Sequence, residues 1–127
     1  MSLINDKGIQ LTVDLTMLTN NGTIKWEREL STKRAPSCDE ENFGFFYICR
    51  NDGDLFRLRE FNLTFYIEDQ RCSSVGIALE IIDEEGRVLW RVPNNPALQY
   101  LFNRVQEKSA NVDAVLERVS RLTKAVA

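Results

Sequence analysis

A chain of 127 residues with 43% hydrophobic and 28% charged side chains has the size and composition of one globular domain. A net charge of −3 argues against a broadly basic nucleic-acid-binding surface, and no apolar run approaches the ~18 residues that span a bilayer. The absence of histidine removes the commonest general base and most transition-metal sites. We therefore expect a soluble single domain over residues 1–127 that is not an enzyme and holds no metal or cofactor.

The three cysteines, Cys38, Cys49 and Cys72, are widely spaced and include no Cys-x-x-Cys pair. An odd number without metal-ligand spacing predicts free thiols. Because no N-terminal stretch has the segments of a signal peptide, we expect a cytoplasmic protein. Cys49 lies within an apolar run, which predicts a small core residue.

The N-terminal region predicts a β-hairpin that follows a flexible leader over residues 1–7. Residues 9–17 alternate between apolar and polar side chains, which is typical of a strand with one buried face. Asn21-Gly22 is a favoured pair for a tight turn, and Ile24 and Trp26 continue the apolar face on a return strand.

Further apolar runs predict more strands, separated by a polar loop at 31–42 and by turns at 52–53 and 83–86. These strands are expected at residues 43–49, 55–58, 61–67, 75–81 and 88–92. The apolar pattern changes parity between Leu58 and Phe61, which predicts a bulge or bend.

About seven strands over residues 8–93, joined mostly by hairpins, indicate an antiparallel meander. Such a meander can stay an open curved sheet or close into a sandwich or partial barrel. The expected fold is α+β and mainly β. The side chains expected in its core are Ile24, Trp26, Phe45, Leu63, Phe65, Ile77, Leu79, Ile81, Val88 and Trp90.

Residues 94–127 predict helix, with Asn95-Pro96 as a favourable start. Apolar residues recur every seven positions from Leu98 to Val126, which is compatible with one long helix. Alternatively Asn111, which tolerates a left-handed conformation, ends one helix before a second begins. We favour two short helices, since both can then pack on a small sheet.

The segment from Trp90 to Leu122 resembles the C-terminal part of small bacterial proteins in which a β-meander ends in a helical tail. The matching residues are Ala97, Leu98, Leu101, Phe102, Val105, Val112, Asp113, Leu116 and Val119. Phe102 stands where that pattern more often has tyrosine. The resemblance implies a bacterial source and this fold, and it carries no activity.

No catalytic set or phosphate-binding glycine loop is recognisable in the sequence. The acidic clusters at 39–41, 68–69 and 83–85 fall in turns or loops, where carboxylates are usually solvated. The four sheet arginines are interpreted as partners of acids across the strands, with an anion pocket as the alternative. They are Arg57, Arg59, Arg87 and Arg91.

The leading expectation is a protein-interaction or accessory domain, with a homodimer as the favoured assembly. A second apolar stripe in the helical segment is expected to form the contact. It consists of Val112, Val115, Leu116, Val119 and Leu122. The alternative is a shell of pleckstrin-homology-like architecture that binds a small molecule or anion. Neither a nucleic acid nor a membrane is an expected partner.

Overall fold

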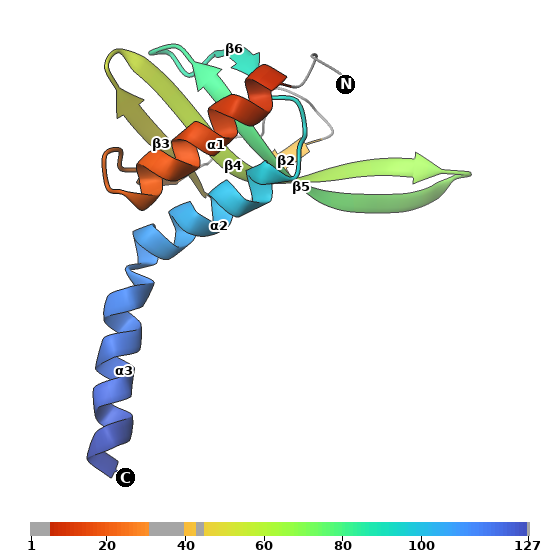
Figure 1. The fold of residues 1–127 in the computed structure, drawn as a ribbon. Coiled ribbons are helices and arrows are strands. Elements are labelled where there is room, and N and C mark those ends of the chain that lie inside the picture. Colours follow the sequence, from red (N-terminus) through yellow and green to blue (C-terminus); the bar gives the residue numbers. More distant parts are fainter. Residues whose placement is uncertain (1–5, 31–39, 43–44, 127) are drawn as a thin grey trace.

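The structure, a computed structural model, describes residues 6–30, 40–42 and 45–126 (Figure 1). Most of the predicted leader and of the predicted loop at 31–42 lies outside these ranges, as does Cys38. Where they are described, both predictions are wrong: residues 6–7 belong to a helix and residues 40–42 to a strand. The elements in chain order are α1 Asp6–Asn20, β1 Glu27–Leu30, β2 Glu40–Asn42, β3 Phe45–Asn51, β4 Asp54–Ile67, β5 Gln70–Ile82, β6 Val88–Arg91, α2 Ala97–Ala110 and α3 Val112–Val126.

The fold is α+β, with an antiparallel sheet in the order β1-β3-β4-β5-β6. Strand β2 also belongs to this sheet and pairs with β4, at residues of β4 beyond those that pair with β3. The sheet is open, and α1 and α2 lie side by side across one of its faces (Figure 1). Among the described residues there are six strands, so neither a seventh strand nor closure into a sandwich or barrel is found.

The largest departure from the sequence prediction is at the N-terminus, where residues 6–20 form helix α1. The alternating apolar residues there divide between two environments. Leu15 is buried, whereas Ile9, Val13 and Met17 are exposed. The predicted strand over residues 9–17, and with it the hairpin, is therefore wrong.

Buried threonines explain why the apolar pattern of the sequence does not predict this helix. Thr12, Thr16 and Thr19 lie on the buried side of α1, and each hydroxyl donates to the carbonyl oxygen four residues earlier, over 2.7–2.8 Å. Since each hydroxyl has its partner within the helix, threonine can lie in an apolar interface. A pattern that counts threonine as polar places the buried face wrongly.

Asn21-Gly22 ends α1 instead of turning a hairpin. Gly22 has φ +79°, and this left-handed conformation ends helices as well as it forms tight turns. Two side chains of α2 hold the same end: Arg104 Nε donates to Asn20 Oδ1 over 2.6 Å, and Lys108 Nζ donates to the Asn20 carbonyl over 3.4 Å.

The main core lies between the two packed helices and one face of the sheet. Within it, the rings of Tyr47 and Phe102 meet edge-on with their centroids 5.9 Å apart. Its buried members are Leu15, Ile24, Tyr47, Cys49, Phe56, Leu58, Leu79, Val92, Leu98, Leu101, Phe102 and Val105. A smaller cluster of Ile48, Leu55 and Ile82 is buried on the opposite face.

The predicted core is only partly confirmed. Ile24 and Leu79 are buried. The half-buried members are Trp26, Phe45, Leu63, Ile77 and Ile81. Phe65, Val88 and Trp90 are 37–38% exposed, so the prediction is wrong for them. Val88 and Trp90 belong to the edge strand β6, which has a neighbour on one side only.

Strand β4 runs without the predicted bulge, since residues 55–67 keep one register against β5. The parity change arises because the strand has apolar residues on both faces: Leu58 packs under the helices, and Phe61 lies on the opposite face. The register shift falls instead in β5, between Ile81 and Ile82.

The outer part of β4 and β5 forms a two-stranded arm that projects from the body, here called the β4–β5 arm and comprising residues 64–73 (Figure 1). Glu68 and Asp69 turn the arm with φ values of +49° and +65°, which a two-residue hairpin turn requires. The expectation that Glu68-Asp69 lies in a turn or loop is confirmed, whereas the strand that follows begins at Gln70 and not at the predicted residue 75.

The C-terminal segment forms two helices, as favoured from the sequence, but the expectation that both pack on the sheet is wrong because α3 has no buried residue. Asn111 has φ 53° and ψ 52°, the left-handed conformation that ends α2, and its N–H donates to the carbonyls of Glu107 and Lys108. Asn95 Oδ1 accepts the Ala97 N–H over 3.0 Å at the start of α2. Within the described ranges, no helix is both long and apolar enough to cross a bilayer.

Candidate functional site

Helix α3 leads away from the body of the domain (Figure 1). At 1.5 Å per residue its 15 residues extend over about 22 Å. None of its residues is buried, in contrast to α2, whose apolar residues all face the core except Ala97 and Ala110 at its ends and the exposed Tyr100. The change of direction at Asn111 therefore separates a packed helix from a projecting one.

The five predicted contact residues all lie on α3. Val112 is half-buried, at the junction with α2, and the other four are exposed, from 41% for Val115 to 68% for Leu122. Val126 continues the apolar stripe and is 85% exposed. We call Val112, Val115, Leu116, Val119, Leu122 and Val126 the α3 stripe.

The spacing of the α3 stripe is that of a coiled-coil seam. Steps of three and four residues alternate from Val112 through 115, 119 and 122 to Val126. Valine at 112, 119 and 126 is β-branched, which suits the first core position of a two-stranded coil. The opposite side carries charges, with Arg121 paired to Glu117 one turn away.

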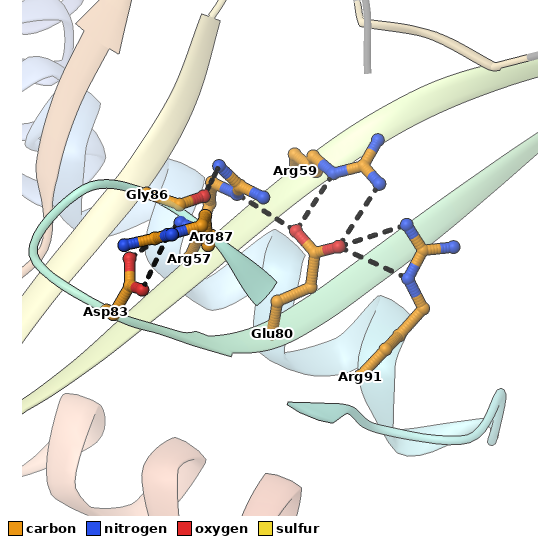
Figure 2. A network of polar contacts seen from close by, with 7 residues as sticks. All are labelled: Arg57, Arg59, Glu80, Asp83, Gly86, Arg87 and Arg91. Carbon is orange, nitrogen blue, oxygen red and sulfur yellow. Dashed lines mark hydrogen bonds and ion pairs between the residues drawn. The ribbon is translucent and has the colours of Figure 1, made fainter. Parts of the chain in front are cut away.

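A second candidate group of side chains lies on the sheet face opposite α1 and α2 (Figure 2). Glu80 is fully buried and accepts hydrogen bonds from three arginines. Arg57 Nε donates to Oε1 over 2.9 Å, Arg59 Nε to Oε1 over 3.1 Å, and Arg91 to Oε2 through Nε and a terminal nitrogen at 3.2 and 3.0 Å. Arg57 also donates to the Gly86 carbonyl.

Strand register explains why these residues meet. Glu80 of β5 is directly opposite Arg57 of β4 on one side and Arg91 of β6 on the other. Arg59 lies two residues along β4 on the same face. Phe61 continues that face, with its ring centroid 5.3 Å from the Arg59 guanidinium.

The arginines control the charge of the cluster. Burial alone would raise the pKa of Glu80, but the hydrogen bond and charge of Arg59, together with those of Arg57, lower it to about 2. Glu80 is therefore ionised at neutral pH and offsets one of three guanidinium charges. Removal of the carboxylate would leave buried guanidinium charge without this partner, which is costly in a protein interior.

The predicted arginine set divides in two. Arg57, Arg59 and Arg91 converge on Glu80, whereas Arg87 pairs with Asp83 in the adjacent turn, with Nε 3.1 Å from Oδ2. Backbone hydrogen bonding from Arg87 is the main cause that lowers the pKa of Asp83. The cross-strand pairing expected from the sequence is present for the first three arginines.

The other chemistry-bearing residues that the structure describes do not assemble into a site. Burial raises the pKa of the Cys49 thiol to about 11, so it is an unreactive core group. Cys72 is a half-buried free thiol on the β4–β5 arm. In the described part of the chain, no three His, Cys, Asp or Glu side chains lie close enough to hold a metal ion.

Two concave regions bear on the ligand-shell alternative. A depression of about 330 Å³ lies where α1 and α2 end, beside Ile24, Trp26 and Lys108. Another, of about 210 Å³, lies on the sheet face opposite the helices, beside Phe46 and Arg57. The sheet face under the helices is filled by the protein's own core, so neither depression lies there.

The chain matches no protein-family model, no curated protein and no solved structure. Its class is therefore described by fold and surface: an α+β domain with an ion cluster on its sheet, an exposed amphipathic helix and a projecting β-arm. The resemblance of the C-terminal third to bacterial proteins stays a prediction from the residues alone.

Proposed function

We propose that the protein is a non-catalytic interaction domain that forms a homodimer through α3. The observation that carries the proposal is the α3 stripe, a coiled-coil seam with no covering segment among the described residues. Monomeric proteins rarely expose a contiguous apolar surface of this kind. A cytoplasmic, bacterial setting completes the proposal, in keeping with the free thiols of Cys49 and Cys72.

The low stability of an isolated short helix also favours a binding partner for α3. Isolated helices of 15 residues are marginal in water, since most helical stability comes from packing of the apolar face. Among the described elements, α3 makes its main contact with α2, and none of its own residues is buried. Packing against another surface would therefore stabilise the helix as well as cover its apolar residues.

A second copy of the chain fits the stripe better than an unrelated surface. A two-fold axis brings the same patch of each copy together, and a seam of alternating three- and four-residue steps is complementary to itself. If each exposed stripe residue contributes on the order of 100 Å², the pair buries about 1,000 Å², the lower bound for a specific interface. The expected dimer is thus of modest affinity.

The proposal is tested by adding one charge on or beside the stripe. Val119→Glu places a carboxylate in the centre of the seam. Ser120→Glu places the same charge at the next residue, which lies outside the α3 stripe and is exposed. At low micromolar concentration, we expect the Val119 variant to be a folded monomer and the Ser120 variant to dimerise like the wild type. Equal masses for both variants and the wild type would contradict the proposal.

A further inference from the structure

One edge of β5 has no neighbouring strand along most of its length in the part of the chain that the structure describes. In the described residues β6 pairs with β5 only at Glu80–Ile82, and no strand pairs with residues 70–78. The Val92 N–H donates to the Leu79 carbonyl, so the backbone of Leu79 points to this edge. By the two-residue period, the N–H and C=O groups of residues 71, 73, 75 and 77 point the same way.

This edge lacks the features that keep sheet edges of monomers from pairing. Natural edge strands are usually short, charged, bulged or interrupted by proline. Residues 72–78, Cys-Ser-Ser-Val-Gly-Ile-Ala, contain no charge and no proline, and they keep a regular register with β4. Val75 at this edge is 62% exposed. An unprotected edge of seven residues is a template for another strand.

We propose that this edge pairs, antiparallel and about a two-fold axis, with the same edge of a second copy. A register centred on Ser74 sets Ser73 opposite Val75 and Cys72 opposite Gly76, so a small side chain faces a larger one in each pair. No like charges meet across the seven residues. A charged edge would repel its own copy, whereas this one does not.

Such pairing would stabilise the β4–β5 arm in particular. A two-stranded ribbon is marginally stable on its own in water, and three or more strands are needed for independent stability. The β4–β5 arm is such a ribbon and exposes Phe65, Tyr66 and Ile67. Joining two copies edge to edge makes a four-stranded sheet, in the order β4-β5-β5-β4, at the base of both arms.

The register makes a sharp prediction about distances. Residues whose backbone points toward β4, such as Ser74, form the non-hydrogen-bonded pairs across the new contact, with Cα atoms about 4.5 Å apart. Two cysteines at position 74 would therefore lie within disulfide range, whereas two at position 73 would be separated by more than the roughly 7 Å limit. Both positions are exposed in the single chain.

Disulfide trapping tests the proposal in the full chain with Cys38 and Cys72 replaced by serine. Under mild oxidation at tens of micromolar, we expect Ser74→Cys to give at least about tenfold more covalent dimer than Ser73→Cys. Equal yields would overturn the proposed register and edge. Adding Val119→Glu separates the surfaces: the position-74 dimer persists if the edge pairs independently of α3, and its loss would show that trapping reflects the α3 dimer alone.

Discussion

The phenyl ring of Phe61 lies over Gly76 on the neighbouring strand, so closely that a Cβ on Gly76 would come within 2.6 Å of the ring. The ring therefore covers backbone at the base of the arm, beside the guanidinium groups of Arg59 and Arg91. Glycine is required here for space and not for an unusual backbone conformation.

Gly76→Ala should displace this ring and destabilise the fold by about 1–2 kcal/mol, the usual cost of overpacking. In a Phe61→Ala background the same glycine change should cost close to nothing, because no ring remains to be displaced. Urea unfolding of the four proteins measures the coupling. An equal cost in both backgrounds would show that Phe61 does not limit the space at this site.

Glu80→Gln should be the most destabilising single change in the ion cluster, by about 3–5 kcal/mol, because it leaves three arginines without their shared carboxylate. The control is Glu84→Gln, which breaks an exposed pair with Arg50 and should cost less than about 1 kcal/mol. Similar unfolding midpoints for the two variants would mean that the buried cluster contributes little.

Acid should remove the same stabilisation. The pKa of Glu80 is lowered to about 2 in the fold, from an ordinary value of 4.5, so the unfolded chain takes up this proton first as the pH falls. The contribution, about 3 kcal/mol, is complete above pH ~5 and is lost progressively toward pH ~2. Wild-type stability should fall more steeply over this window than that of Glu80→Gln, and parallel curves would contradict the assignment.

The helical N-terminus predicts opposite responses at adjacent positions. Thr12→Asp places a charge in a fully buried interface and should cost about 3 kcal/mol or more. Val13→Asp places it on the exposed side of α1 and should change stability by less than about 0.5 kcal/mol. Thermal unfolding of the two variants distinguishes a helix from the strand predicted over residues 9–17. In that strand Val13 would be buried and Thr12 exposed, so Val13→Asp would be the more destabilising change.

Position 111 should accept glycine more readily than alanine. The left-handed backbone conformation there is unfavourable for most residues that have a β-carbon. We expect Asn111→Gly to preserve stability and Asn111→Ala to cost about 1 kcal/mol. Hydrogen exchange of the amides near the junction provides a second readout. Greater protection there in the alanine variant would indicate that α2 and α3 have merged into one helix.

Features with local sequence signals were predictable, and those that depend on distant contacts were not. The turn at Asp52-Gly53, the break at Asn111 and the exposed stripe of α3 follow from short patterns. The sequence pattern does not predict α1, because its buried threonines bond their own backbone. For the arm, the turn at Glu68-Asp69 was expected, but the mostly polar residues 70–74 give no apolar alternation and their place in β5 comes from pairing with β4.

The candidate sites divide in the same way. The sheet arginines were recognised as partners of acids, but only the strand register shows that three of them share Glu80. The free edge of β5 has no motif at all. It becomes visible once β6 is seen to pair with only the last residues of β5.

The central claim, self-association through α3, is tested most directly by sedimentation equilibrium at low micromolar concentration. For a chain of 14.7 kDa at this concentration, below the tens of micromolar at which the β5 edges are expected to pair, the account predicts a dimer mass for the wild type and for Ser120→Glu, and a monomer mass for folded Val119→Glu. A wild-type protein that sediments as a monomer at every concentration would contradict the claim, as would a Val119→Glu variant that keeps the dimer mass at low micromolar concentration.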